Sequence, residues 1–338
     1  MVNGGTDSAI GAILKRLRGR SAGLGPETRE ASDAIPDAAV NATPPGALKI
    51  CATNFWADFS MDRGLVKYLV DVAFGDWTLC ESQADADLVL TSVFPHGAAE
   101  RPHKTLAIIW ENVRPNYSFY AYSLSSDLDH YGGRNFRLPH WYREVAWSPD
   151  YLPWDLSGEG SHGHEPLLPL PFLMQPRSEP FPTGRKFCAF VARNPEPYRV
   201  MTAEAMRAIA PVDAYGLIAG SVESRSKYEI LRDYAFSMCF ENSLFPGYHT
   251  EKLVQAWAAG TIPLYFGDRS VELDFNRGAF LNKYDFPSLD AFVEEVRRVY
   301  ASAELQERIW REPLITHEPS LAPAAAFLRE ALRRIRSP

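Results

Sequence analysis

Polar side chains are concentrated in residues 239–253, which read CFENSLFPGYHTEKL. The apolar run FSMCFENS leads into this segment and predicts a strand, while TEKLVQAWAAG predicts the helix that follows. Asn242, Ser243 and Tyr248 therefore lie at the carboxyl end of a strand. Ligands of parallel α/β sheets bind at that end, so these side chains are candidates for a binding site.

The start of the expected helix adds a charged pair. Thr250 is a favourable N-cap, Gly260 suits the helix end, and Glu251 and Lys252 stand in the first turn. The helix dipole disfavours a cation there by about 0.3–1 kcal/mol, and Glu251 offsets part of this cost. An anionic ligand held by Lys252 and the helix amides would explain the placement.

A second junction, CAFVARNPEPYRVM, repeats the arrangement. A strand ends at Arg193, Pro197 suits the first helical position, and Arg199 follows in the first turn. Two cations at two helix starts favour a diphosphate as the ligand. Arg199 would bind it through its planar guanidinium fork, and Lys252 would bind it as a point charge. The alternative is that both cations are solvated or paired with carboxylates, namely those of Glu251, Glu196 or Glu204.

Composition sets the class of protein. The 338 residues exceed one comfortable core, so we expect two domains, and 46% apolar with 23% charged residues is typical of a soluble globular protein. The net charge of −7 argues against a nucleic-acid partner. No apolar run is long enough for a membrane span, so we expect no integral membrane segment. The four cysteines lack C-x-x-C spacing and indicate buried thiols in a reducing compartment rather than a zinc site.

The chain divides by composition into a flexible N-terminal segment, an α/β domain, a Pro/Gly-rich linker, a second α/β domain and a terminal helix, at 1–46, 47–150, 151–184, 185–320 and 321–338. Within the first segment, Ala9 to Arg20 is either a short basic amphipathic helix that touches a membrane surface or, as we favour, an ordinary terminal helix or a disordered tail. In the linker, His162 and His164 make a metal site conceivable, although an exposed connector is favoured.

Strands alternate with helices in both large segments, which predicts parallel sheets and right-handed crossovers. We expect the helix at 62–74 to present Leu65, Tyr68, Leu69 and Val72 on one face. Two such domains facing one another leave a cleft between their strand ends. Neither carries G-x-G-x-x-G or G-x-x-x-x-G-K-[ST], so a dinucleotide or P-loop site has no motif support.

The segment FCAFVARNPEPYR together with FENSLFPGYHTEKL and GTIPLYFGD resembles the signature of the α-1,3/1,4-fucosyltransferases, glycosyltransferase family 10, of the bacterial type. The resemblance covers about Lys186 to Tyr300 and implies a GT-B fold, with two Rossmann-like α/β domains facing across a cleft. It implies that the second domain binds GDP-fucose, the donor substrate, through Arg199, Asn242, Ser243, Tyr248, Glu251 and Lys252.

The first domain is more weakly similar, through LAIIWENVRPNYSFYAYSLS and RLPHWYRE. By this resemblance Glu111, at the end of an expected strand, is the catalytic base. Burial beside Trp110 would raise its pKa toward working pH. From the residues alone, Glu111 capping Asn112 or pairing with Arg114 is the alternative.

The family implies an inverting transfer of L-fucose to a hydroxyl of a GlcNAc or N-acetyllactosamine acceptor, with a lipid-linked acceptor compatible and the acceptor-binding residues open. We expect no essential metal and no cofactor, since the D-x-D at Asp85 to Asp87 opens a core strand. His249 and Phe266 depart from residues common in relatives. A cytoplasmic enzyme, with a location peripheral to the inner membrane as a variant, is expected.

Two alternatives stay open: the same fold using another nucleotide sugar, and a glycan- or nucleotide-binding protein without catalysis.

Overall fold

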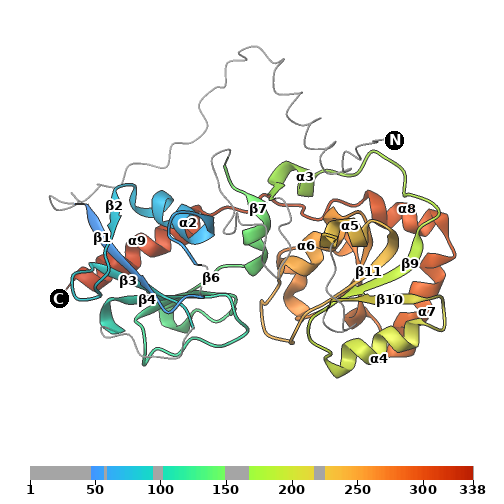
Figure 1. Ribbon diagram of the computed structural model, residues 1–338, viewed down its shortest axis with the longest axis horizontal. Helices are drawn as coiled ribbons and strands as arrows, with labels where there is room; N and C mark the ends of the chain where they lie inside the picture. Colours follow the sequence, from blue (N-terminus) through green and yellow to red (C-terminus); the bar gives the residue numbers. More distant parts are fainter. Residues whose placement is uncertain (1–46, 57–58, 94–101, 149–166, 217–224, 338) are drawn as a thin grey trace, which may run out of the picture. The chain divides into compact units, whose positions relative to one another are not determined.

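The computed structural model describes residues 47–56, 59–93, 102–148, 167–216 and 225–337 (Figure 1). The expected segment 1–46 and the histidines His162 and His164 lie outside these residues. The described part contains two large parallel β-sheets flanked by helices, which is the α/β architecture that the sequence predicts, and a third sheet of two short strands.

The first sheet has six strands in the order β2-β1-β3-β4-β5-β6, and every neighbouring pair is parallel. The two central strands β3 and β4 are buried at every residue, as is typical of parallel strands covered on both faces. The strands are β1 (Leu48–Thr53), β2 (Trp77–Leu79), β3 (Leu88–Thr91), β4 (Thr105–Ile109), β5 (Tyr122–Ser125) and β6 (Asn135–Arg137).

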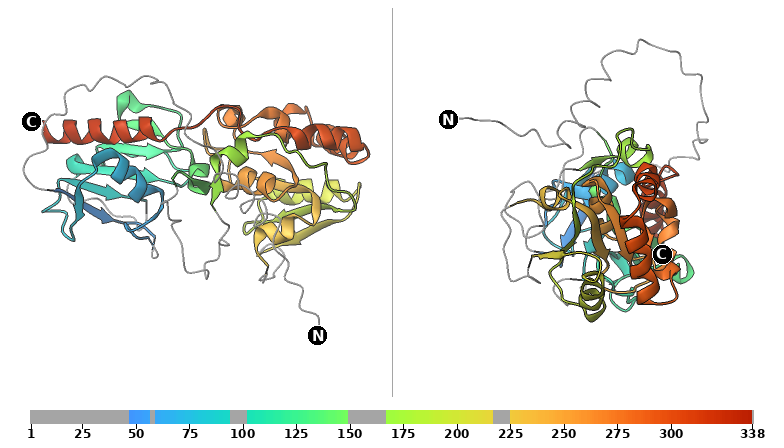
Figure 2. Two further views of the ribbon diagram at one scale, coloured as in Figure 1. Left: turned by 90° about the horizontal axis from the view of Figure 1, so that it is seen from above. Right: turned by 90° about the vertical axis from the view of Figure 1, so that its right-hand side faces the viewer.

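Two helices from opposite ends of the described chain share the core of this sheet. Helix α2 (Gly64–Phe74) lies beside α9 (Ala322–Arg336), and Leu69 and Leu328 belong to one hydrophobic cluster with the strands (Figure 2). Within the expected terminal helix, residues 322–336 are helical and pack on the first sheet. The buried face of α2 includes Val66 and Val70 instead of Val72. Val72 is 43% exposed, so its expected position on the buried face is wrong.

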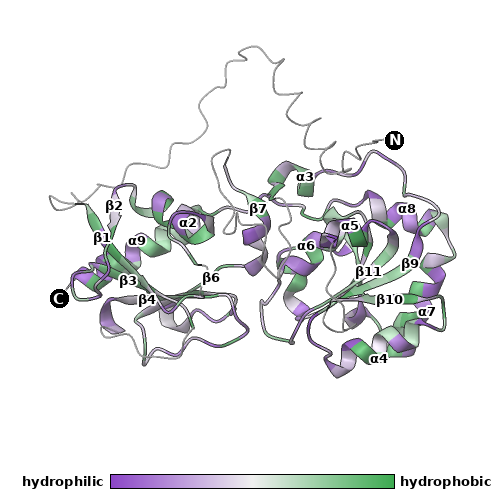
Figure 3. Cartoon of the chain, viewed as in Figure 1, coloured by the Kyte–Doolittle hydropathy of each residue, from purple (hydrophilic) through white to green (hydrophobic). Residues whose placement is uncertain are grey.

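The second sheet has five strands in the order β10-β9-β11-β12-β13, again all parallel. Figure 3 shows its apolar strands beside helices with one hydrophobic and one hydrophilic face. Its elements are β9 (Lys186–Val191), α4 (Pro197–Met206), β10 (Val212–Tyr215), α5 (Lys227–Leu231), β11 (Tyr234–Phe240), α6 (Glu251–Ala258), β12 (Ile262–Phe266), β13 (Leu281–Asn282), α7 (Leu289–Tyr300) and α8 (Ala303–Arg311).

Short elements connect the two sheets. Strands β7 (Val145–Ala146) and β8 (Leu168–Pro169) pair in parallel, and α3 (Leu170–Met174) follows within the expected linker. Among the 3-10 helices, η3 (His140–Glu144) follows β6, and η5 (Arg269–Leu273) follows β12. The others are η1 (Pro102–Lys104), η2 (Tyr131–Gly133), η6 (Arg277–Ala279) and η7 (Lys283–Asp285).

A buried ion pair connects the end of β6 with the residue after η5. Arg137 donates to both carboxylate oxygens of Asp274, with Nη1–Oδ1 at 2.9 Å and Nη2–Oδ2 at 2.7 Å. His249 Nδ1 lies 2.6 Å from Asp274 Oδ2, and the His249 side chain is fully buried. Burial raises the pKa of Asp274, but the hydrogen bonds from Arg137 and His249 outweigh it and hold that pKa well below its usual range.

We expect Asp274→Asn to lower the free energy of unfolding by about 3–5 kcal/mol, because it leaves the Arg137 guanidinium buried without its anion. Urea titrations at pH 7 measure this loss. The double change Arg137→Met with Asp274→Leu is the matched control and should be less destabilising, since no charge is left alone.

The same urea titrations, repeated as a function of pH, test how the lowered pKa of Asp274 makes stability depend on pH. A depressed folded-state pKa stabilises the native protein above the unfolded value of about 3.9, and this stabilisation disappears as pH falls through the folded value. Asp274→Asn should flatten that part of the pH dependence. An equally steep loss in the variant would contradict the role of Asp274.

Candidate active site

The candidate residues occupy loops at the carboxyl ends of parallel strands in both sheets. Glu111 follows β4, Arg199 belongs to the helix after β9, and residues 241–252 connect β11 to α6. In an open parallel sheet these loops are where ligands bind.

Arg199 is a buried cation that has no carboxylate partner in the part of the chain that the structure describes. The residue is 2% exposed and lies in the first turn of α4, which begins at Pro197 as the sequence predicts. Its guanidinium donates to the carbonyl oxygens of Asn194 and Phe240 and, at 2.7 Å, to Asn242 Oδ1. Its Nε is buried and has no hydrogen-bond partner among the described residues. A charge in this position is poised for an anion.

Lys252 lies between two carboxylates. Its Nζ is 3.2 Å from Glu241 Oε2 and 3.5 Å from Glu251 Oε1. Burial opposes the charged ammonium, but Glu241 and Glu251 outweigh it, so the pKa of Lys252 is raised. Of the pairings that the sequence left open, that of Lys252 with Glu251 is present, whereas Glu204 binds Arg207 instead.

Glu241 holds this helix start in place. It is fully buried, and its carboxylate accepts hydrogen bonds from the Thr250 amide at 2.9 Å and from the Thr250 hydroxyl at 2.7 Å. Thr250 in turn caps α6 by accepting from the Lys252 amide. Glu241 therefore supplies the negative charge that a helix N-terminus with a lysine requires.

Gly247 allows the same loop to approach the first sheet. Its φ is +72°, and a Cβ at this position would lie 2.2 Å from the carbonyl oxygen of Ser126. Its amide donates to Asp268 and its carbonyl accepts from Arg137, at 3.1 Å each. Only glycine fits this conformation and this space.

Tyr248 and Glu251 lie where the two halves of the site meet. Tyr248 is 5% exposed, and Lys252, Glu241, Glu251 and Glu111 all influence its pKa, which burial raises. Glu251 Oε2 lies 3.8 Å from Nδ1 of His140 in η3. Burial raises the pKa of Glu251, but Lys252, His140 and Lys227 together hold it below its usual range, so Glu251 is an anion.

Glu111 is half-buried, directly after the buried Trp110. Burial raises the pKa of Glu111, with Arg143 and Lys252 opposing and Glu251 adding to the rise. Glu111 thus shares its electrostatic surroundings with the donor-site candidates. The alternative pairing with Arg114 is absent, because Arg114 Nη1 lies 3.1 Å from the Tyr131 hydroxyl and 3.6 Å from Asp127.

A direct hydrogen bond joins the loops after β4 and β11. Asn112 Nδ2 donates to Ser243 Oγ at 2.6 Å. A hydroxyl that accepts one hydrogen bond keeps its own hydrogen to donate, so Ser243 retains a donor for a ligand. A second link is that Gln255 on α6 donates to Glu144 of η3 at 2.9 Å.

The structure therefore places all seven predicted residues around two adjoining loops. Arg199 contacts Asn242, Lys252 contacts Glu251, and Ser243 contacts the neighbour of Glu111. Sequence reasoning missed Glu241, Asn112 and His140 as parts of the site. Glu241 could have been found, because an acid at the end of a mostly apolar strand must be paired when buried.

His249 and Phe266, the two residues expected to differ from those common in relatives, have structural roles. His249 belongs to the Arg137–Asp274 cluster, and Phe266 packs against Tyr198 and Tyr284. Across the described residues, no group of three or more His, Cys, Asp or Glu is placed to hold a metal. Asp87 of the D-x-D pairs with Arg336 of α9. None of the helices in the described ranges is long and apolar enough to cross a membrane.

Residues 184–321 match the model of glycosyltransferase family 10 (fucosyltransferase), C-terminal part. This range covers β9 to α8 and every donor-site candidate. Over this range the chain is similar to glycosyltransferase family 10.

Two relatives extend the match. An alpha-(1,3)-fucosyltransferase of Helicobacter pylori is 28% identical over 297 residues, which are 80% of this chain and 61% of that protein. The 3-galactosyl-N-acetylglucosaminide 4-alpha-L-fucosyltransferase of Homo sapiens is 31% identical over 157 residues, 43% of this chain and 42% of that one. The chain thus spans less than two thirds of the length of these curated relatives.

A solved alpha1,3-fucosyltransferase with GDP-fucose superposes on this chain with a TM-score of 0.64 and 25% identity, covering 91% of this chain and 94% of that one. A solved alpha1,3-fucosyltransferase with GDP superposes on this chain with a TM-score of 0.65. The expected GT-B fold is confirmed.

For the candidate site, a first prediction concerns the buried cation Arg199. Inorganic pyrophosphate should bind the protein, and Arg199→Ala should weaken binding about 10-fold or more, because a charge-assisted hydrogen bond is lost. Arg199→Lys should fall between, since it keeps the charge without the fork. Isothermal titration calorimetry measures the affinities.

Arg207→Ala is the matched control, because Arg207 ends the same helix and pairs with exposed Glu204. It should bind pyrophosphate as the unchanged protein does. Equal affinities for Arg199→Ala and Arg207→Ala, with both folded by circular dichroism, would refute the anion site.

A second prediction concerns the Asn112–Ser243 bond. If it couples the two loops, Asn112→Ala and Ser243→Ala should be non-additive in thermal and urea unfolding, with a coupling free energy of about 0.5–1.5 kcal/mol. Additive single and double variants would show that the contact carries no energy.

Proposed function

We propose that this protein is an inverting α-1,3-fucosyltransferase that moves L-fucose from GDP-fucose to a hydroxyl of a GlcNAc-containing glycan. The observation that carries the proposal is Arg199, a 2% exposed guanidinium with no carboxylate partner in the described chain, next to Lys252 at a second helix start. The diphosphate of a nucleotide sugar is the anion that two neighbouring helix starts and two cations suit.

The donor contacts follow from the charges. Arg199, Lys252 and the first amides of α6 bind the diphosphate, and Asn242 orients Arg199 through its Oδ1. Glu251 is an anion, so it binds sugar or ribose hydroxyls rather than phosphate. Ser243 donates its hydroxyl hydrogen, and Tyr248 lies between the donor residues and Glu111.

The reaction is a single displacement. The acceptor oxygen forms a bond to fucose C1 while the bond from C1 to the phosphate oxygen breaks, and GDP leaves with that electron pair. Glu111 takes the acceptor proton. Arg199 and Lys252 neutralise the charge that grows on the leaving diphosphate, which is the task a metal performs in other transferases. The proposed reaction therefore needs no added metal.

The acceptor class is supported by the names of two relatives. Both the Homo sapiens protein above and the 4-galactosyl-N-acetylglucosaminide 3-alpha-L-fucosyltransferase of Gorilla gorilla gorilla, 33% identical over 129 residues, are named for a galactosyl-N-acetylglucosaminide. We include a cytoplasmic location in the proposal, because all four cysteines are free thiols, as is usual in a reducing compartment.

The third prediction tests the reaction and its base. With GDP-fucose and N-acetyllactosamine, mass spectrometry should detect a fucosylated product with and without EDTA. Glu111→Gln should lower kcat about 10²–10⁴-fold and leave GDP affinity unchanged. Glu144→Gln is the control: it makes the same Glu-to-Gln change at a carboxylate that accepts a hydrogen bond from Gln255, and it should not cause this loss of kcat.

Undiminished turnover in Glu111→Gln would refute the base. If the unchanged protein gives no product and does not bind GDP, the proposed fucosyltransferase activity is refuted. Nuclear magnetic resonance of the product measures its anomeric configuration and so tests inversion.

The fourth prediction concerns pH. Glu111 acts only when ionised, so kcat/KM should fall on the acid side as pH passes through its pKa, above the usual value of about 4.3 because burial raises it. Arg143 favours the carboxylate, so Arg143→Gln should move this limb to higher pH and Arg143→Lys should not. A limb at the same pH in all three proteins would contradict Glu111 as the titrating group.

A further inference from the structure

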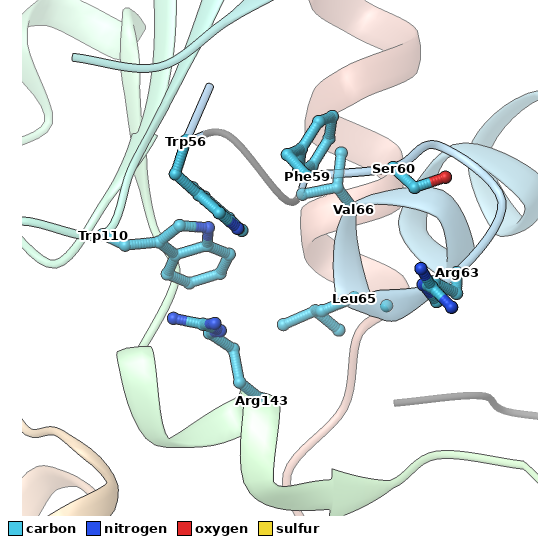
Figure 4. A pocket seen from close by; sticks show the side chains of 9 residues that line it. Trp56, Phe59, Ser60, Arg63, Leu65, Val66, Trp110 and Arg143 are labelled. Carbon is cyan, nitrogen blue, oxygen red and sulfur yellow. The ribbon is translucent and has the colours of Figure 1, made fainter. Parts of the chain in front are cut away.

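Two hollows on the first α/β half, in the part of the chain that the structure describes, differ greatly in size. One lies between α2 and Trp110 (Figure 4), and its free space of about 10 Å³ holds one group of the size of water. The other has about 440 Å³, which is within the range of small-molecule sites in proteins. This larger hollow has room for a ligand the size of a sugar ring.

The larger hollow lies at the amino ends of β4 and β5. Its wall includes His103, from the turn that precedes β4, and Tyr122, which begins β5. Arg334 reaches it from the last turn of α9. Glu111 follows the opposite end of β4, and the five residues of this strand, at about 3.3 Å each, lie between the two places. None of the predicted site residues lines the hollow, so it is separate from the candidate active site.

The wall of this hollow is aromatic and basic. Three of its residues are tyrosines (Tyr117, Tyr120 and Tyr122), two are arginines (Arg134 and Arg334), and none is Asp or Glu. A concave wall with cations and no carboxylate attracts an anion. The phenol rings add flat apolar area that a ring-shaped ligand can cover.

Arg134 is fixed in the wall, and no carboxylate among the described residues pairs with it. Its guanidinium carbon lies 4.0 Å from the ring centre of Tyr117. Its Nε donates to the carbonyl oxygen of Ala121 at 2.8 Å, and its Nη2 donates to that of Tyr120 at 3.2 Å. No described residue accepts a hydrogen bond from Nη1, so both hydrogens of that nitrogen are available to a ligand.

The number of available donors selects the kind of anion. Arg334 is half exposed, and its Nε already lies 2.6 Å from Glu330 Oε1. The wall therefore offers an anion one fixed nitrogen, Nη1 of Arg134. A phosphate group carries up to about two charges on three acceptor oxygens and is bound best by several donors, whereas a carboxylate carries one charge. A single nitrogen in a wide aromatic hollow suits a carboxylate attached to a ring.

We propose that this hollow is a carbohydrate site, separate from the transfer site, that binds a hexuronic acid. The carboxylate on C5 of such a sugar accepts hydrogen bonds from Nη1 of Arg134, and its ring lies against the tyrosines. His103 and Ser337 belong to the same wall and are polar partners for the sugar hydroxyls. The inference goes beyond the proposed transfer of fucose, because it assigns a different ligand to a different place.

Titrations followed by saturation-transfer nuclear magnetic resonance test the ligand class on the full chain. Glucuronic acid should bind about 10-fold or more tighter than glucose, which lacks the carboxylate, and tighter than acetate, which lacks the ring. Inorganic phosphate should not displace it. The methyl glycoside of glucuronic acid distinguishes two sources: it binds like the free acid if the ligand is a residue of a glycan, and it fails to bind if the ligand is a free sugar acid.

Substitutions at Ala121 test the place. Ala121 lines the hollow, and a change of Arg134 itself would also remove the bonds of Arg134 to the backbone. Ala121→Glu brings a carboxylate to the wall and should weaken glucuronic acid binding about 10-fold or more. Ala121→Gln is the matched control, since it adds the same bulk without the charge, and it should weaken binding less. Arg199→Ala, in the donor site, should bind glucuronic acid as the unchanged protein does.

The proposal is overturned if glucuronic acid binds no tighter than glucose or acetate, if phosphate displaces it, or if the two Ala121 variants bind it equally. Loss of binding in Arg199→Ala would also overturn it, because the sugar acid would then lie in the donor site. These titrations need no turnover, so they decide this site whether or not fucose is transferred. Absence of fucose transfer with intact glucuronic acid binding would instead refute the proposed function.

Discussion

The carboxylate of Glu241 is the contact on which the site depends. A buried carboxyl group at the end of a strand needs hydrogen-bond partners, and Glu241 has three: the Thr250 amide, the Thr250 hydroxyl and the Lys252 ammonium. These bonds attach the carboxyl end of β11 to the start of α6. They fix the direction of the helix amides and the position of Lys252 before any ligand binds, which is preorganisation of the kind that anion stabilisation requires.

Charge balance separates the two cations. Lys252 is compensated by Glu241 and Glu251, so its place in the site is stable without a ligand. Arg199 is not: its bonds go to two carbonyl oxygens and to Asn242, which are dipoles rather than charges. A buried guanidinium held only by dipoles gains more from an incoming anion than one that is already paired. Arg199 is therefore the residue through which diphosphate binding would be strongest.

Much of this arrangement could be predicted from the sequence. The apolar runs gave the strands of the second half, and the capping residues Thr250 and Pro197 gave the helix starts, because these signals are local. The resemblance gave the site residues that geometry brings together. The packing of α9 on the first sheet was beyond reach, because an amphipathic pattern shows that a face is buried but not against what. The position of Val72 failed for the same reason.

The role of Asn112 was hidden for a related reason. Its partner Ser243 lies 131 positions away in the chain, and nothing in either local sequence indicates the other. The missed residues Asn112 and His140 belong to the first half and contact the loop and the helix that carry the donor residues, and Glu144 of the same half contacts that helix through Gln255.

These contacts are polar and few, unlike the apolar clusters within each half. Polar contacts fix direction more than they add stability, because water competes for the same groups. A base and a donor carried by different sheets need direction above all, since a misplacement of about 1 Å costs roughly 10²-fold in rate. The Asn112–Ser243 bond meets that need most directly, for it joins the residue after the proposed base to the loop that holds Asn242, the partner of Arg199.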